Sequence, residues 1–132
     1  MLKDFVVADN AVDILAHGKR VDLHNDSNLT EIRFRPMESG VEFEFTEWTE
    51  TNSEPRIVLV LQFFEVDWIQ ISPGILIDGK GDIAELGYKE PADFDYDWLL
   101  KERDASSEAH LFIRFERDQF IRLHARRATA IL

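Results

Sequence analysis

The longest apolar run of the chain, within residues 56–71, places the strongest constraint on its fold. Seven of the eight positions 57–64 hold valine, isoleucine, leucine or phenylalanine. Side chains of a strand alternate between the two faces of a sheet, so an uninterrupted run predicts a strand that is covered on both faces. Pro55 precedes the run and a Ser-Pro-Gly sequence follows it, which favours a strand over a buried helix. We therefore expect a central strand, with Leu59 and Val60 deeply buried on opposite faces.

Two alternating stretches precede this strand. Residues 30–36 and 40–46 each alternate apolar and charged side chains. If residues 36–39 form the loop between them, Arg33 lies opposite Glu42 and the apolar side chains share one face. Together with the central strand, this pattern predicts a three-stranded antiparallel meander.

The C-terminal stretch predicts a second hairpin, formed by residues 110–116 and 120–126. Its apolar positions share one face if Phe115 lies opposite Ile121, with residues 117–119 as the loop. Two arginines then face each other on the outer side, and because like charges repel, an anionic neighbour is expected. That neighbour is either an acid of the same chain or a bound phosphate or carboxylate group. The candidate binding residues of this face are Arg114, Arg122, His124 and Arg126.

Two segments have helical features. Residues 10–18 fit a short helix that Asn10 caps and Gly18 ends. Residues 92–102 fit a strand or a helix, and the Leu-Leu-Lys-Glu sequence at 99–102 favours a helix with three aspartates in its first turn. The glycines within residues 78–82 suit a tight turn between the apolar segments 75–77 and 83–86.

These patterns predict a single domain, residues 1–132, with a mainly β fold. We expect an antiparallel sandwich or strongly curled sheet of about seven to nine strands, with one or two short helices. The alternative is an α+β fold in which a helix at residues 92–102 packs on one antiparallel sheet.

The chain is acidic, with 26 acidic and 15 basic residues and a net charge of -11. Affinity for nucleic acid comes largely from neutralising phosphate charge, so we expect no nucleic-acid partner. A solvated surface that favours solubility is the simpler explanation of the acids. Residues 31–54, however, carry seven acids against two bases, which would suit a basic protein partner. The candidate residues of this surface are Glu42, Glu44, Glu47 and Glu50.

The chain has no cysteine, which excludes disulfides, thiolate metal sites and a cysteine nucleophile. Residues 1–7 lack the layout of a secretory signal, and no apolar run is long enough to cross a bilayer. We therefore expect a cytoplasmic protein without membrane association, either a monomer or a small homo-oligomer.

Asp22, His24 and Asp26 would point to one side of an extended segment, a geometry that a metal ion could use. Turn formation is the simpler explanation, since such side chains bond the nearby backbone. The sequence contains no zinc-protease, serine-hydrolase or phosphate-binding motif. We expect no catalytic residues, no cofactor and no enzymatic activity. An enzyme without a recognisable motif is the alternative.

Residues 23–32, Leu-His-Asn-Asp-Ser-Asn-Leu-Thr-Glu-Ile, resemble the His-Asp-Ser entry into a strand found in many small bacterial β-rich proteins. Immunity proteins of the Imm50 type, from polymorphic toxin systems, are among them. The resemblance covers residues 22–66 and the closing hairpin. It implies a cytoplasmic, non-catalytic protein that neutralises a toxin by protein–protein binding, with no active site to transfer. A binder of small molecules in a β-lined pocket is a further alternative.

Overall fold

A computed structural model of the chain describes residues 1–47, 54–78 and 82–132. The strands are β1 (Leu2–Lys3), β2 (Phe5–Val7), β3 (Asp13–Ala16), β4 (Lys19–Asp22), β5 (Ser27–Arg35), β6 (Gly40–Glu47), β7 (Ile57–Ile71), β8 (Ile83–Lys89), β9 (His110–Phe115) and β10 (Phe120–Ile131). The helical segments are α1 (Pro73–Asp78) and the short 3-10 turns Pro36–Glu38, Glu102–Asp104 and Glu116–Asp118. The predicted mainly β fold is confirmed, and the α+β alternative is wrong.

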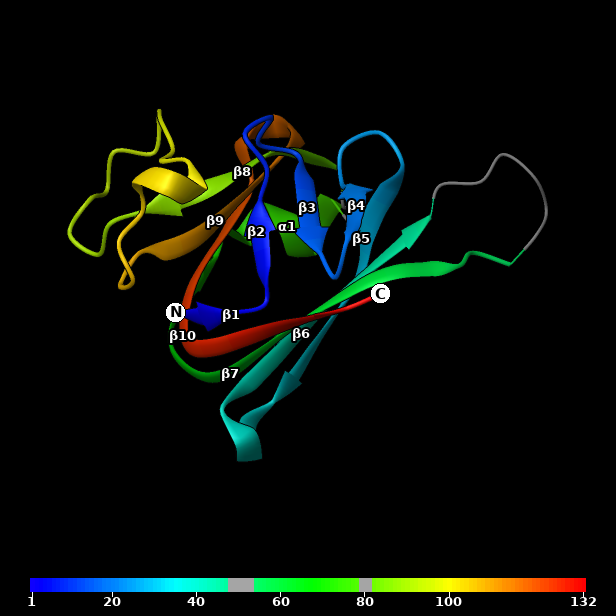
Figure 1. Cartoon of the computed structure of the whole chain (residues 1–132), viewed down its shortest axis with the longest axis horizontal. Helices are drawn as coiled ribbons and strands as arrows, with labels where there is room; N and C mark the ends of the chain where they lie inside the picture. The colour runs from blue at the N-terminus through cyan, green and yellow to red at the C-terminus, as the bar shows by residue number, and fades with distance from the viewer. Residues whose placement is uncertain (48–53, 79–81) are drawn as a thin grey trace.

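The strands form two sheets (Figure 1). The larger sheet has the order β5-β6-β7-β10-β9-β8, and β1 pairs in parallel with β10. The smaller sheet has the order β2-β3-β4. It packs on one face of the larger sheet, where the ring centroids of Phe5 in β2 and Phe63 in β7 lie 6.4 Å apart. One core therefore lies between the two β layers.

The buried apolar side chains of both sheets make up this core. From the small sheet and the segment after it come Phe5, Val7, Ile14, Ala16 and Leu23, and from the large sheet come Val41, Phe43, Phe45, Leu59, Leu61, Phe63, Leu111, Ile113, Phe115, Ile121, Leu123 and Ala125. Their alternation along each strand is the period expected for strands with one face on the core.

β7 lies inside the large sheet, between β6 and β10, as the central-strand prediction requires. Leu59 is fully buried on the core face, as predicted. The prediction for Val60 is wrong, because its side chain is only half-buried. The core layer covers one face of β7, whereas the neighbouring positions on the other face of β6 hold the charged residues Glu42 and Glu44.

The first hairpin has the predicted register. Arg33 pairs with Glu42 and Arg35 with Gly40, and β6 continues into an antiparallel pairing with β7. The meander is therefore confirmed. Its four-residue loop closes at Ser39, whose φ of 49° lies in the left-handed region.

The closing hairpin differs from its prediction by two residues. Ile121 pairs with Ile113, not with Phe115, and Arg122 pairs with Phe112. A shift of two residues keeps every side chain on its predicted face, so the core alternation is unchanged. The turn decides the register, because Arg117 and Asp118 both adopt left-handed φ values, 63° and 62°.

The predicted helix at residues 10–18 is also wrong, because this segment contains β3 and the turn into β4. The Asn10 side chain accepts hydrogen bonds from the backbone of Val12 and Asp13, which forms a turn instead of a helix cap. Gly18, with a φ of 76°, then closes the β3–β4 hairpin.

Near the predicted turn at residues 78–82, the segment 75–77 lies in the short helix α1, which begins at Pro73. Proline suits this first helical position because it has no N–H to leave unpaired. The turn itself falls partly on residues 79–81, outside the described residues. No helix in the described ranges is long and apolar enough to cross a membrane.

Candidate functional site

Arg122 on β10 organises the face of the large sheet that points away from the core. Its side chain is fully buried. The guanidinium makes five hydrogen bonds, to His110 Nδ1 (2.9 Å), the Asp93 carbonyl (2.7 Å), the Tyr96 hydroxyl (3.2 Å) and the Glu90 and Pro91 carbonyls (3.2 Å each). A guanidinium has five N–H groups, so every donor of this buried cation has an acceptor.

Arg114 on β9 holds the same segment from a second point. Its guanidinium donates to the Tyr96 carbonyl and lies 3.4 Å from a carboxylate oxygen of Glu85. Phe112, Phe120 and Tyr96 form an aromatic cluster beside it, with ring centroids 5.0–5.2 Å apart. Both arginines therefore fix the backbone of residues 90–96 on the sheet.

The end of this segment is fixed on β8. Leu100 forms two backbone hydrogen bonds with Tyr88, at 3.0 and 2.9 Å. The adjacent Gly87 has no side chain, and a Cβ there would lie 2.6 Å from the Leu99 Cβ and 2.9 Å from the Leu100 carbonyl oxygen. This close approach explains a glycine in the middle of a strand.

These contacts overturn the predicted helix at residues 92–102. Within this range the Asp93 carbonyl accepts from Arg122 and the Leu100 carbonyl accepts from the Tyr88 N–H, whereas a helix would direct its carbonyls along its own axis. The side chains of Asp93 and Asp95 accept from the backbone N–H two residues on, at 2.9 and 3.1 Å. Such local bonds compete with helix formation.

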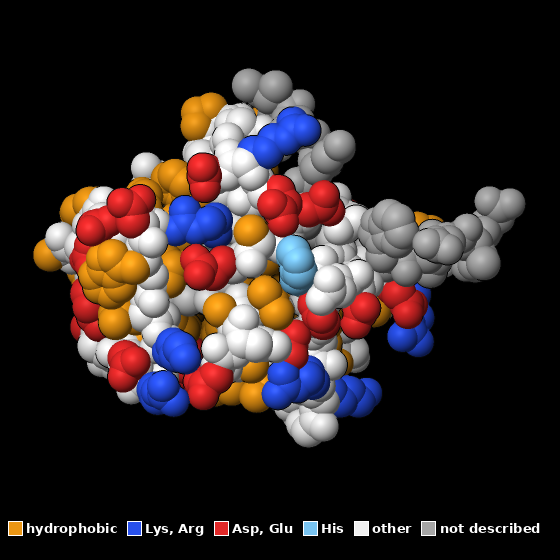
Figure 2. All heavy atoms as spheres, turned by 90° about the horizontal axis from the view of Figure 1, so that it is seen from above, with side chains coloured by type: hydrophobic (Ala, Val, Ile, Leu, Met, Phe, Trp, Pro, Cys, Tyr) orange, Lys and Arg blue, Asp and Glu red, His pale blue; other side chains and the backbone are white. Residues whose placement is uncertain are grey.

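We call residues 90–100 the acidic–aromatic loop (left in Figure 1). It contains four acids and no basic residue. Two large aromatic side chains protrude from it, Phe94 with 63% and Trp98 with 46% of their surface exposed. Asp95 and Asp97 are exposed beside them. Seen from above, this end of the molecule carries interspersed acidic and hydrophobic side chains (Figure 2, left).

Buried cations support both exposed rings from below. The Arg122 guanidinium carbon lies 4.7 Å from the Phe94 ring centroid. The Lys89 ammonium lies 3.3 Å from the Trp98 ring centroid and 3.4 Å from an Asp93 oxygen, and Lys89 is fully buried. A cation over an aromatic face is attractive, more so when the cation is desolvated. The rings are thus held from one side and exposed on the other.

Two of the four acids of the loop have lowered pKa values. The backbone N–H of Asp95, with the positive charges of Lys89 and Arg122, lowers the pKa of Asp93 below its ordinary value. Hydrogen bonds from Ser106 likewise lower the pKa of Glu90. Both carboxylates therefore stay ionised at neutral pH and under mildly acidic conditions.

Of the other two candidate residues of the closing hairpin, His124 adjoins the buried support, with its ring centroid 5.5 Å from that of His110, whereas Arg126 lies on the surface. Arg114 and Arg122 do not face each other, as explained by the shifted register. His124 Nδ1 lies 2.7 Å from an Asp67 oxygen, and its buried Nε2 has no hydrogen-bond partner among the described residues. Arg126 is exposed, 3.7 Å from Glu65. The predicted group of four is thus divided between a buried support and a separate surface.

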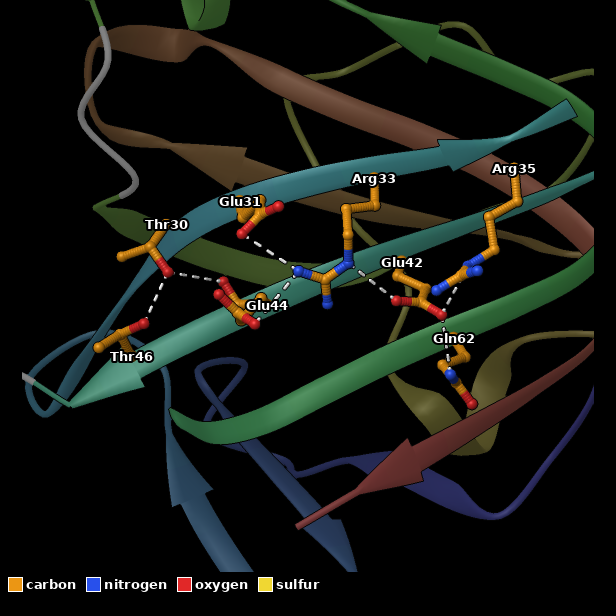
Figure 3. A network of polar contacts seen from close by, with 8 residues as sticks. All are labelled: Thr30, Glu31, Arg33, Arg35, Glu42, Glu44, Thr46 and Gln62. Carbon is orange, nitrogen blue, oxygen red and sulfur yellow. Dashed lines mark hydrogen bonds and ion pairs between the residues drawn. The ribbon is translucent and has the colours of Figure 1, made fainter. Parts of the chain in front are cut away.

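The predicted acidic surface on β6 is largely neutralised by the chain itself (Figure 3). Glu42 accepts hydrogen bonds from Arg33 (3.1 Å), Arg35 (3.0 Å) and Gln62 (2.9 Å). Burial would raise the pKa of Glu42, but these hydrogen bonds outweigh it and the pKa lies below its ordinary value. Glu44 lies 3.2 Å from Arg33.

Glu47, at the end of β6, lies 3.3 Å from Arg56. Glu50 falls outside the described residues. The acids of this surface that the structure describes therefore have basic neighbours of their own, unlike Asp95 and Asp97 on the loop.

The three metal candidates lie in a turn. Asp22 Oδ1 accepts from the backbone N–H groups of His24 (2.8 Å) and Asn25 (2.9 Å), and His24 Nδ1 lies 2.6 Å from the Ile83 carbonyl. Within the described residues, no group of three or more His, Asp or Glu side chains is arranged to hold a metal ion.

The exposure of Phe94 and Trp98 was not predicted from the sequence. The one signal for them was the alternation of Phe94, Tyr96 and Trp98 with three aspartates, which does not suit a helix with an apolar face. Comparison of the chain with protein-family models, curated proteins and solved structures found no match.

Replacing Arg122 with glutamine should destabilise the protein by about 2 kcal/mol, because a fully buried side chain loses most of its hydrogen bonds and three part-buried carbonyls lose their donors. Urea unfolding measures this change. Arg126 provides the matched control, since it lies on the same strand with 75% of its side chain exposed. Arg126→Gln should change the free energy of unfolding by under about 0.5 kcal/mol. Equal effects of the two substitutions would contradict the supporting role of Arg122.

His110 should make stability depend on pH. Burial and the charge of Arg122 lower its pKa from 6.5 to about 4, although Asp67 and Glu90 act in the opposite direction. Between these values the unfolded chain binds a proton that the folded chain does not, so the free energy of unfolding falls with pH from about 6.5 to 4, by on the order of 2 kcal/mol.

The His110→Asn variant keeps an acceptor near the position of Nδ1 but does not titrate. Its free energy of unfolding should therefore fall less than that of the wild-type protein over the same pH range, when both are measured by urea unfolding. Parallel pH curves would show that His110 is not held neutral by its surroundings.

Proposed function

We propose that this chain is a binding protein that docks a basic protein partner on the acidic–aromatic loop. The observation that carries the proposal is the exposure of Phe94 and Trp98 on a backbone fixed by Arg122. Large aromatic side chains contribute a disproportionate share of binding energy in protein interfaces. Here they stand beside the exposed carboxylates of Asp95 and Asp97.

The fixed backbone supports this proposal. A loop that becomes ordered only on binding loses conformational entropy at that step, which weakens the complex. In this chain, the hydrogen bonds of Arg122, Arg114 and Leu100 order the loop before any partner arrives. The two rings are therefore presented in one arrangement.

The charge of the loop indicates the chemistry of the partner. Asp95 and Asp97 are exposed, and residues 90–100 carry four acids without a base. A surface of this sign attracts a basic partner during diffusion and repels an acidic one. Lysine and arginine side chains of the partner could also stack on the exposed faces of Phe94 and Trp98.

The resemblance of residues 23–32 to immunity proteins suggests a biological setting. We propose that the basic partner is a toxin of the same cell, that the chain neutralises it by covering its surface, and that this takes place in the cytoplasm of a bacterium. This setting requires no catalytic residue in the chain.

Replacing Phe94 and Trp98 with serine should abolish partner binding. The full chain and this variant are immobilised and exposed to a lysate of the source cells, and the proteins retained by each are quantified. At least one basic protein should be retained by the wild-type chain and lost on the variant. Leu76→Ser, which alters a side chain that is 80% exposed on α1, is the matched control and should retain it.

The purified partner then tests the role of charge. Association with the wild-type chain should slow as salt rises, since exposed charges are screened over about 10 Å at 0.1 M. Asp95→Asn/Asp97→Asn should slow association as well, whereas Glu38→Gln/Glu54→Gln, which removes two exposed charges elsewhere, should not. The proposal fails if no protein distinguishes the wild-type chain from the serine variant, or if association ignores both salt and the loop aspartates.

A further inference from the structure

The two edge strands of the large sheet, β8 and β5, differ in the pairing of their backbone groups. At the β8 edge, Tyr88 bonds Leu100 in both directions and the Leu86 N–H donates to the Ala11 carbonyl. The other edge is β5. Among the described residues, the backbone groups of residues 31–35 that point away from β6 have no partner. An edge strand with unpaired backbone groups is a template for another strand.

The side chains of this edge form a self-complementary pattern. Glu31, Arg33 and Arg35 lie on the outer face of β5, and Ile32 and Phe34 on the other. Phe34 is 57% exposed although it lies on the same side of the sheet as the core. A two-fold axis through Arg33 would place Glu31 of one strand opposite Arg35 of an antiparallel copy, and Ile32 opposite Phe34.

We propose that a second copy of this chain adds to the β5 edge, antiparallel and centred on Arg33, and so forms a dimer with a continuous sheet. This register gives two cross-strand pairs between Glu31 and Arg35 and two apolar pairs between Ile32 and Phe34. An axis one residue earlier would place Arg35 opposite Leu29, and an axis one residue later would place it opposite Arg33. The chosen register alone matches both faces.

The existing contacts leave Glu31 and Arg35 able to pair in this way. Their side chains are 51% and 50% exposed. Arg33 is the one residue that faces its own copy, and it lies within 3.1–3.2 Å of carboxylate oxygens of Glu31, Glu42 and Glu44 (Figure 3). These carboxylates offset the repulsion that two facing arginines would otherwise cause.

A charge exchange tests the proposal on the full-length chain. Sedimentation equilibrium should reveal a wild-type dimer below about 0.5 mM. Glu31→Arg and Arg35→Glu each place like charges opposite each other at two symmetric positions. Each variant should therefore raise the dissociation constant at least about tenfold.

An equimolar mixture of the two single variants tests the register itself. In the mixed dimer, the arginine at position 31 of one chain faces the glutamate at position 35 of the other, and the native Arg35 faces the native Glu31. Dimerisation should return to within about threefold of wild type. Glu108→Arg, an exposed acid distant from β5 in the sequence, controls for total charge, and thermal unfolding confirms that every variant is folded.

Three outcomes would overturn the proposal. The wild-type chain could remain monomeric at all concentrations, in which case the edge does not accept a second copy. Both single variants could dimerise as the wild type does, which would place the contact elsewhere. The mixture could associate no better than its components, which would exclude the register centred on Arg33.

Discussion

The course of the acidic–aromatic loop across the large sheet depends on the burial of the Arg122 guanidinium. Arg122 lies at the centre of the sheet face that points away from the core, and a buried guanidinium is tolerated only where its donors are satisfied. The carbonyls of Glu90, Pro91 and Asp93 supply most of the acceptors. The chain between β8 and β9 therefore crosses the sheet as an irregular loop, and its aromatic side chains protrude on the far side.

This requirement divides the outer face of the sheet into two surfaces with different chemistry. Over β5, β6 and β7, acids and arginines of the same chain neutralise each other, as the contacts of Arg33 with Glu42 and Glu44 illustrate. Over β9 and β10, the guanidinium of Arg122 donates to backbone carbonyls beneath the loop. The side chains of Asp95 and Asp97 are exposed to solvent. The exposed carboxylates of Asp95 and Asp97 thus stand beside the exposed aromatic rings of the loop.

Much of the fold could be predicted from the alternation of apolar residues. Alternation determines which side chains share a face, so the meander from β5 to β7 and the core face of the closing hairpin were predicted correctly. The alternation of apolar residues cannot distinguish registers that differ by two residues, because both place the same side chains on the same face. The turn sets the register through the left-handed conformations of Arg117 and Asp118. Such conformations are uncommon in residues other than glycine, so these two residues carry no reliable sequence signal for them.

The candidate site could not be predicted for a related reason. Residues 92–102 have helical propensity at Leu99 and Leu100, but the acceptors required by Arg122, some thirty residues later in the chain, override it. Such long-range contacts leave no local pattern. The residues 10–18 were misread in the same way, because pairing with β2 and β4 determines their conformation.

Docking of a partner on pre-arranged aromatic rings requires that the acidic–aromatic loop is ordered in the free protein. Backbone ¹⁵N relaxation of the wild-type chain tests it directly, since order parameters near about 0.85 indicate a rigid backbone and values below about 0.6 a flexible one. Residues 92–98 should give order parameters close to those of the neighbouring strands β8 and β9. Values in the flexible range for these residues would show that Arg122, Arg114 and Leu100 do not order the loop in the free protein.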